Sequence, residues 1–236
     1  MQVLELTLAT LAGNLALDEA LLLKAESSGE VLRLWQWGLP AVILGAGSRI
    51  TEDVNEDACR ADGVEVSRRS SGGGTVLLAP GCVCYSLILS YSRSPELAEI
   101  RSSYAYVFER IRAALADVAP GLECAGTSDL ALAGRKFSGN AQQRKRHHLL
   151  HHGTILYDFD LALVSRYLRL PSRQPAYRRQ RGHGAFLMNL PVTAPELKRR
   201  LRSAWQADSS LTTWPEELVG NLVAEKYSRE DWIRRR

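Results

Sequence analysis

The spacing of apolar residues divides this chain into short strands and amphipathic helices. Apolar positions recur at helical intervals over 14–26 and again over 95–118, which predicts two helices. Short apolar or alternating runs at 31–37 and 41–45 predict strands. These elements lack the regular strand–helix alternation of a doubly wound fold. We therefore expect an α/β (α+β) fold with a mixed, largely antiparallel sheet flanked by helices.

Turn and cap signals refine the middle of the chain. An acidic segment, 51–62, predicts a helix with Thr51 as its N-cap. Pro80-Gly81 interrupts the apolar run 75–92, which predicts a hairpin of two buried strands. Ala133-Gly134 predicts a tight turn between two further short strands, and the arginine-rich segment 171–184 is expected to be a loop.

Residues 196–236, which follow Pro195, are predicted to form two more helices. There is no internal repeat and no low-complexity linker. We expect residues 1–195 to form one domain. Residues 196–236 are expected to pack on that same domain as C-terminal helices, with no separate accessory domain.

Composition narrows the function classes. The chain has 236 residues, of which 45% are hydrophobic and 24% charged, so it can build an ordinary core. A net charge of +4 favours an anionic ligand or an acidic partner, but it is too small to indicate nucleic acid. No apolar run approaches the roughly 18 residues of a membrane span, and no signal peptide is visible. The four cysteines form no CxxC pair, and a reduced, cytoplasmic location is expected.

The segment RRSSGGGTV, residues 68–76, is the strongest local signal. Three consecutive glycines leave the backbone free to adopt unusual conformations and let a ligand approach the N–H groups closely. Arg68 and Arg69 add planar donor groups suited to phosphate or carboxylate. The pattern predicts a cradle for an anionic group, although a flexible loop beside a solvated basic pair has the same pattern.

A second group of residues surrounds Lys136 in the segment 134–142. A lysine on a short strand, with Gly139 leaving room beside it, can direct one ammonium group into a pocket. A lone hairpin lysine is usually solvated, but here His152 enters an apolar strand shortly afterwards. Together with the glycine run, these residues favour a pocket in which the ammonium group meets a phosphate or a polarised carbonyl.

Two other chemistries are weighed against this one. His147, His148, His151 and His152 form two pairs four residues apart, which on a helix would suit zinc. However, no carboxylate or thiolate is placed to complete the ligand set, and a strand follows directly. No GxSxG motif is present, and we recognise no acidic partner for a Ser–His pair of the hydrolase type.

Three motifs, RRSSGGGTV, SDLALAGRKFSGNAQ and HHGTILYDFDL, occur in this order. With them the chain resembles the lipoate–protein ligase family, within the superfamily of biotin–lipoate ligases and octanoyltransferases. The resemblance covers most of the chain, from residue 14 to about residue 191. It implies that ATP and lipoate (or octanoate) give an acyl-adenylate. The acyl group then passes to a lysine of a carrier: a lipoyl domain of a 2-oxoacid dehydrogenase or the glycine-cleavage H protein.

The resemblance also implies roles for individual residues. Lys136 matches the lysine that bridges the acyl carbonyl and the phosphate, and is the implied catalytic residue. Mg²⁺ would accompany ATP, with Asp129 as a candidate ligand. The implied substrate-binding and adenylate-binding positions are Arg69, Ser71, Gly72, Gly73, Gly74, Thr75, Val76, Leu77, Asp129, Gly139 and His152.

Two departures leave alternatives open. Many family members have a histidine where this chain has Leu78, and the best-known bacterial ligases carry an accessory domain. Either a separate accessory subunit exists, or the protein transfers an acyl group without adenylation. In the second case Cys124, in the loop before the lysine strand, would be the thioester-forming nucleophile. A binding-only relative and a nucleic-acid partner for the arginine-rich segments are weaker alternatives, and neither a nucleic-acid nor a membrane partner is expected.

Overall fold

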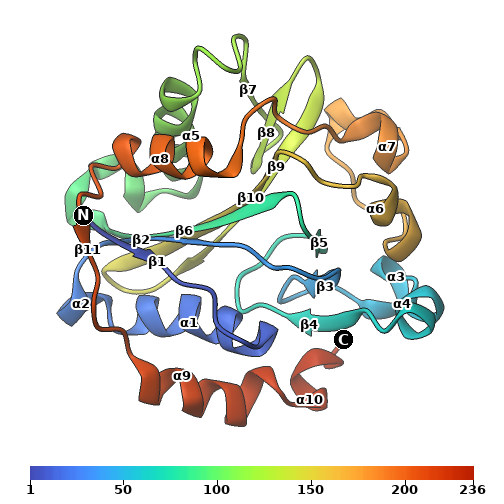
Figure 1. Cartoon of the computed structure of the whole chain (residues 1–236), viewed down its shortest axis with the longest axis horizontal. Coiled ribbons are helices and arrows are strands. Elements are labelled where there is room, and N and C mark those ends of the chain that lie inside the picture. The colour runs from blue at the N-terminus through green and yellow to red at the C-terminus, as the bar shows by residue number, and fades with distance from the viewer.

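The computed structural model describes all 236 residues. Its largest element is an eight-stranded sheet with the order β11-β1-β2-β6-β10-β9-β8-β7 (Figure 1). Within this sheet only the β11–β1 and β1–β2 pairs are parallel. The expected mixed, largely antiparallel sheet is therefore confirmed. Its strands are β1 (Gln2–Glu5), β2 (Val31–Trp35), β6 (Cys82–Ser90), β7 (Glu123–Ala125), β8 (Asp129–Leu132), β9 (Arg135–Arg144), β10 (His148–Leu156) and β11 (Ser209–Ser210).

A second sheet of three strands lies beside the large one. Its order is β4 (Glu65–Arg68), β3 (Ala41–Leu44) and β5 (Val76–Leu78). The glycine run connects β4 to β5, and it therefore sits at the end of this small sheet. In Figure 1 the small sheet faces the broad central strands β6 and β10 across the middle of the molecule. The candidate site lies between these two sheets.

Helices cover both faces of the large sheet because its central strands bury both of their faces. On β6, Cys82, Cys84 and Ile88 belong to one apolar cluster, whereas Val83 and Tyr85 belong to the other. The first cluster is closed by α1 (Leu11–Leu23), and the second by α5 (Ile100–Ala114) and α8 (Ala194–Ala204). Figure 1 shows α1 below the sheet and α5 and α8 above it.

The remaining helical elements are short and lie around this frame. Their bounds are α2 (Ala25–Ser28), α3 (Ile50–Asp53), α4 (Glu56–Asp62), η1 (Tyr91–Arg93), η2 (Pro95–Ala98), α6 (Ala162–Tyr167), η3 (Ala176–Arg178), α7 (His183–Phe186), α9 (Glu216–Leu222), η4 (Val223–Tyr227) and α10 (Glu230–Ile233). No helix in the structure has both the length and the apolar character needed to cross a bilayer.

Two sequence predictions about local structure are wrong. The run 75–92 is not a hairpin, because β5 pairs with β3 in the small sheet while β6 joins the large one. The chain crosses between the sheets at Gly81, where a Cβ would lie 2.0 Å from the carbonyl oxygen of Asp158. Thr51 is not an N-cap either. The segment splits into α3 and α4, and the side chain of Asn55 caps α4 by accepting from Ala58 N.

The histidine-rich segment is a strand rather than a helix. β10 begins at His148, so His147 lies in the preceding turn. Neighbouring side chains on a strand point to opposite faces. His151 is fully buried in the aromatic core against Tyr104 and Phe108, whereas His152 lines the cavity between the sheets. The zinc alternative, which required a helix, has no structural basis.

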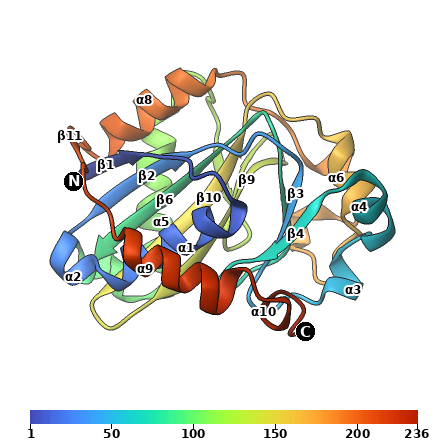
Figure 2. The ribbon, with the colours of Figure 1, turned by 60° about the horizontal axis from the view of Figure 1, so that its bottom comes forward.

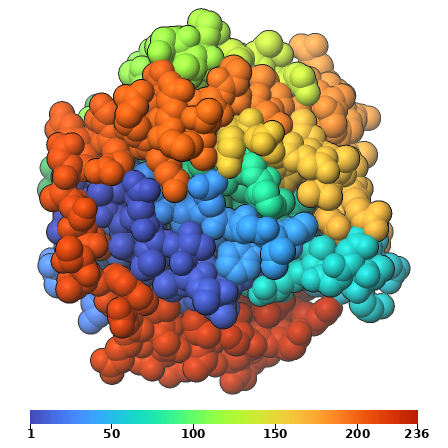
Figure 3. All heavy atoms as spheres, in the orientation of Figure 1, coloured from blue at the N-terminus to red at the C-terminus, as the bar shows by residue number.

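The C-terminal segment packs against the rest of the domain at two places. Figure 2 shows α9 lying across α1, and Figure 3 shows this segment along the lower edge of the molecule. Lys226 and Tyr227 both bind the Glu19 carboxylate of α1, at 2.6 and 2.7 Å. Farther on, the indole N–H of Trp232 donates to the carbonyl of Arg68 at 2.9 Å. The last helices thus support the strand that precedes the glycine run.

Candidate functional site

Two connected cavities lie between the small sheet and the large one. The first has a volume of about 130 Å³ and the second about 340 Å³. The same group of residues borders both, and it includes Lys136, Asp129, Gly139 and Thr75. Lys136 therefore lies at the junction of the two cavities. The sequence-predicted lysine and glycine-run residues meet at this junction although more than 50 positions separate them in the sequence.

The β8–β9 hairpin fixes the ammonium group of Lys136. Its turn is the predicted Ala133-Gly134 pair, and both residues have the positive φ of a tight hairpin turn, 50° and 68°. The Lys136 Nζ lies 2.8 Å from Oδ1 of Asp129, which is buried on the adjacent strand. A Cβ on Gly139 would lie 2.8 Å from Nζ, so only glycine leaves the ammonium group in this position. The sequence prediction that Gly139 makes room for Lys136 is confirmed.

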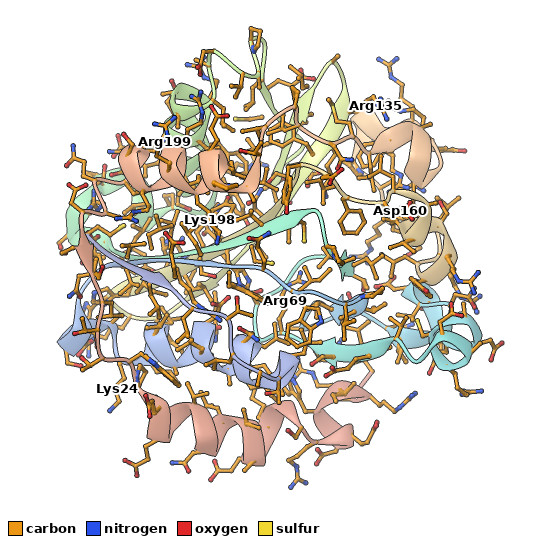
Figure 4. The ribbon with its side chains drawn as sticks, in the orientation of Figure 1. Lys24, Arg69, Arg135, Asp160, Lys198 and Arg199 are labelled. Atoms are coloured by element: carbon orange, nitrogen blue, oxygen red, sulfur yellow. The ribbon has the colours of Figure 1, made fainter.

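Arg69 supports the glycine loop and also borders the first cavity. Its guanidinium is buried and donates to the Ser71 hydroxyl at 3.0 Å and to the carbonyls of Gly72 and Gly74 at 2.6 and 2.8 Å. Burial lowers the pKa of Arg69 to about 10, so it remains charged at neutral pH. Figure 4 shows Arg69 near the centre of the molecule. The side chain holds the loop carbonyls and turns the intervening backbone toward the cavities.

Arg68 binds backbone carbonyls and does not make the anion contact that the sequence predicted. It is fully buried, and its guanidinium donates to the carbonyls of Gly45 and Ser48, both at 2.8 Å, and to that of Ile233 at 2.9 Å. All three acceptors are backbone oxygens of neighbouring segments. Arg68 is therefore a structural anchor, and that part of the prediction is wrong.

A buried polar chain that the sequence did not reveal crosses the first cavity. Oδ1 of Asp18 lies 2.6 Å from the buried guanidinium of Arg33, and Oδ2 lies 3.0 Å from Nδ1 of His152. The other ring nitrogen, Nε2, lies 2.6 Å from the hydroxyl of Ser71. Burial would raise the pKa of Asp18, but the charge of Arg33 and the hydrogen bond with His152 outweigh it, and the pKa lies below its usual range. The chain connects α1 to the glycine loop.

This chain has the connectivity of a Ser–His–Asp triad, which sequence reasoning missed because 53 positions separate Asp18 from Ser71. Its chemistry differs from that of a hydrolase. Ser71 is 1% exposed and does not border either cavity, and its hydroxyl also accepts from Arg69. A nucleophile must reach the reacting carbon. Ser71 instead joins His152 to the loop, and the three residues stabilise the site.

The first cavity is the more apolar of the two. Its apolar wall consists of Leu15, Trp35, Ile43, Val76, Leu78 and Ala141. A cavity of about this size accommodates a small hydrocarbon group, since about 150 Å³ is enough for benzene. The indole N–H of Trp35 is buried and has no hydrogen-bond partner. The first cavity therefore combines an apolar wall with charged groups, which include Asp18, Arg69 and His152.

The second cavity combines basic groups with an apolar floor. Its basic side chains are Arg169, Arg173, Arg178 and His183, which come from the predicted arginine-rich segment and its immediate neighbours. Its apolar residues include Phe159, Leu168 and Phe186. Such a combination suits a ligand with a planar ring and an anionic tail. The predicted loop contains two short helical turns, η3 and α7.

Neither Cys124 nor Cys84 is placed and charged as an activated nucleophile. Cys124 is exposed on β7, at the edge of the large sheet, and borders neither cavity. Partial burial of its thiol and the charge of Glu109 raise its pKa despite Arg112. Cys84 does border the first cavity, but a hydrogen bond with Cys82 and burial hold its pKa well above the usual value. Both thiols are protonated at neutral pH.

The acidic groups do not form a metal centre. No group of three or more His, Cys, Asp or Glu side chains is placed to share an ion. Asp129, the sequence-predicted magnesium ligand, already accepts from Lys136 and from the Tyr177 hydroxyl, the latter at 2.8 Å. The donor set therefore does not fit a dedicated protein site for magnesium.

Residues 10–200 match the family model of the lipoyl protein ligase A/B catalytic domain. The chain belongs to this family. Among curated relatives, it is 30% identical over 158 residues to the probable lipoate-protein ligase A of Mycoplasma pneumoniae, covering 66% of this chain and 45% of that relative. It is 27% identical over 253 residues to the octanoyltransferase LipM of Carboxydothermus hydrogenoformans, covering 94% of each chain. Relatives within the family are thus of both reaction types.

Solved structures show the same fold over nearly the whole chain. A bipartite lipoate protein ligase studied with its E2 lipoyl domain, from Thermoplasma acidophilum, has a TM-score of 0.82 at 23% identity, covering 99% of this chain and 95% of that one. A lipoate-protein ligase A bound with ATP has a TM-score of 0.78 at 25% identity, covering 99% and 98%. The match extends beyond residue 200, so the C-terminal helices are included in the structural similarity.

Proposed function

We propose that this protein is an ATP-dependent lipoate–protein ligase. It activates lipoate, or octanoate, as the acyl-adenylate and transfers the acyl group to a lysine of a lipoyl carrier domain. The observation that carries the proposal is that the Lys136 ammonium group borders two adjacent cavities, one with an aliphatic wall and the other with several arginines. A mixed anhydride of a fatty acid and AMP has its acyl chain on one side of the reacting carbonyl and its nucleotide on the other.

In the first step, a carboxylate oxygen of the acid attacks the α-phosphorus of Mg-ATP and pyrophosphate leaves. Magnesium enters as part of this substrate. In the second step, the amine of the carrier lysine attacks the acyl carbon, AMP leaves with the bonding electrons, and the amine loses its proton. In the first step the carboxylate brings its negative charge to the site, and in the second step negative charge develops on the acyl carbonyl oxygen as the amine adds. The Lys136 ammonium is placed to orient the first and to stabilise the second.

The two cavities provide binding energy for the two halves of the adenylate. Burying each methylene of the acyl chain against the apolar wall of Leu15, Ile43 and Leu78 contributes about 0.8 kcal/mol. In the second cavity the guanidinium groups of Arg173 and Arg178 are suited to the phosphate. The backbone of the glycine loop, held by Arg69, lies between the two cavities and can donate to the phosphate oxygens.

One observation favours a second function, an octanoyltransferase. Several octanoyltransferase LipM relatives match 94% of this chain at 27–29% identity. A transferase would require a thioester on Cys124. That thiol lies outside both cavities and its pKa is raised, so the site chemistry supports the ligase better.

The proposed acceptors are lipoyl domains of 2-oxoacid dehydrogenases or the H protein of glycine cleavage. The support is indirect, since the ligase from Thermoplasma acidophilum was studied with its E2 lipoyl domain. That ligase is bipartite, and a separate accessory subunit is part of the proposal for this chain as well.

Intact-mass analysis of an apo lipoyl domain distinguishes these functions. One tube contains lipoate or octanoate with Mg-ATP, and the other contains an octanoyl-carrier protein without ATP. Acylation in the first tube alone is the expected result. Acylation in the second tube alone, with a mass adduct on Cys124, would establish the transferase instead. Reaction in neither tube, even after an accessory subunit is added, would favour a binding-only protein.

A further inference from the structure

The Asp129 carboxylate has two partners, and the second comes from a distant part of the chain. Oδ1 contacts the Lys136 ammonium at 2.8 Å, and Oδ2 accepts a hydrogen bond from the Tyr177 hydroxyl at 2.8 Å. Burial and the neighbouring carboxylate raise the pKa of Tyr177, so its hydroxyl remains a protonated donor. With both oxygens engaged, the carboxylate cannot rotate without breaking a charge-assisted contact.

The segment that carries Tyr177 is tied to the hairpin that carries Lys136. The Arg181 guanidinium donates to the carbonyl of Gly134 at 2.7 Å, in the hairpin turn. Farther along, the N–H of Met188 donates to the carbonyl of Lys136 itself at 2.9 Å. The segment 177–188 therefore follows the hairpin from one end to the other, and Tyr177 is the side chain that reaches Asp129.

The same segment forms a wall of the basic cavity. Arg178, His183 and Phe186 border that cavity, and the Tyr177 ring packs on Phe186 with the ring centroids 5.1 Å apart. The ring edge also lies near Gly126, where an added Cβ would be 3.8 Å from it. The contact with Phe186 thus places the ring independently of its hydroxyl.

We propose that Tyr177 is a positioning residue, which fixes the Asp129 carboxylate and through it the Lys136 ammonium at the junction of the two cavities. This inference rests on the proposed function, because it assigns Tyr177 to the reaction in which Lys136 acts. Tyr177 touches neither the acyl group nor the nucleotide in this scheme. Its contribution is to hold Oδ1 of Asp129 toward Nζ, so that the ammonium is already in place when charge develops.

Tyr177→Phe is the matched perturbation, because it removes the hydroxyl and keeps the ring against Phe186. Loss of one charge-assisted hydrogen bond should lower kcat for transfer to the lipoyl domain about tenfold, with KM for lipoate changed less than about twofold. Tyr91→Phe is the control. The Tyr91 hydroxyl donates to the carbonyl of Lys145 in the β9–β10 turn and borders neither cavity, so this variant should retain the wild-type rate.

A double-mutant cycle with Asp129→Asn separates positioning from general damage. If Tyr177 acts through Asp129, Tyr177→Phe should lower kcat by less than about twofold in the Asp129→Asn background. A full tenfold loss in that background would overturn the proposal, because Tyr177 would then act by another route. A Tyr177→Phe variant with wild-type kcat would also overturn the proposal.

A readout that needs no turnover keeps this inference separate from the proposed function. The rate at which an amine-directed reagent labels Lys136, measured at one pH by peptide mass mapping relative to exposed Lys24, reports how firmly Asp129 holds the ammonium. Labelling of Lys136 should rise severalfold in Tyr177→Phe and stay unchanged in Tyr91→Phe. If the wild type transfers no acyl group, the proposed function fails, and this labelling still decides the role of Tyr177. Unchanged labelling in Tyr177→Phe would refute that role.

Discussion

Replacing Gly139 with alanine displaces the Lys136 ammonium group without touching its chemistry. The new Cβ would lie 2.8 Å from Nζ and 2.9 Å from Cε, whereas ordinary contact begins near 3.4 Å. Opening the contact with Nζ from 2.8 Å to 3.4 Å moves the ammonium by about 0.6 Å. A misplacement of about 1 Å can cost about a hundredfold in rate. We therefore expect Gly139→Ala to lower kcat roughly tenfold.

The fold should tolerate the same substitution. The new Cβ would meet the far end of the flexible Lys136 side chain, and its three nearest neighbours are all side-chain atoms. Gly139 does not have a positive φ, and alanine in a strand is more favourable than glycine by about 0.5–1 kcal/mol. Gly153→Ala is the contrasting case, because its Cβ would lie 2.8 Å from the backbone oxygen of Gly139 and 1.9 Å from the side-chain oxygen Oδ1 of Asn140. That variant should lose stability as well as activity.

The assay pairs a rate with a melting temperature. Acylation of an apo lipoyl domain is followed by intact mass with lipoate and Mg-ATP, and unfolding is followed by the fluorescence of the five tryptophans. Gly220→Ala, where nothing lies within 4 Å of the new Cβ, is the control and should match the wild-type rate. A Gly139→Ala protein with both wild-type kcat and wild-type Tm would refute the assignment of Lys136 to this position. A large fall in its Tm would show instead that the strand itself is displaced.

Two further outcomes follow from the cysteine and histidine environments. Cys124→Ser should change the ATP-dependent rate by less than about twofold, because the thiol lies outside both cavities, and a lost activity would identify the thioester mechanism. Burial and then the charge of His152 lower the pKa of His151 to about 3. Between about pH 6.5 and 3, His151 therefore binds a proton in the unfolded chain but not in the folded protein. As the pH falls through this range, the free energy of unfolding should decrease by up to about 1.4 kcal/mol per pH unit. Urea titrations at several pH values check this, and a His151→Gln variant with an unchanged slope would contradict it.

Local patterns in the sequence were enough for the fold class and for the junction residues. The β8–β9 hairpin was predictable because Ala133-Gly134 is a typical tight-turn pair, and Gly139 because a glycine inside a strand suggests a close approach. Its contact with Lys136 depends on the register shift in the β8–β9 pairing, since residues three apart on a regular strand point to opposite faces. The β5–β6 connection was not predictable. An apolar run broken by Pro-Gly has the same pattern whether its two strands pair with each other or join different sheets. The close packing of Gly81 against Asp158 accompanies the second arrangement, and it involves a residue far away in the sequence.

The site was predictable only where its residues lie within one motif. Asp18 looks like an ordinary helix residue in sequence, and its contacts with Arg33 and His152 depend on the packing of α1 against the large sheet. Arg68 and Arg69 look equivalent in sequence, yet β4 turns one toward backbone carbonyls of its neighbours and the other toward the glycine loop. Tyr177 was hidden in the same way, because 48 positions separate it from Asp129.

The most direct test of the central claim is the transfer rate of Lys136→Met, beside the wild type, in the tube with lipoate and Mg-ATP. Methionine keeps most of the side-chain volume and removes the charge, so the Tm should change little. The proposed mechanism predicts that acylation of the lipoyl domain falls by about a hundredfold or more in this variant. A folded Lys136→Met protein that acylates the lipoyl domain at the wild-type rate would contradict it.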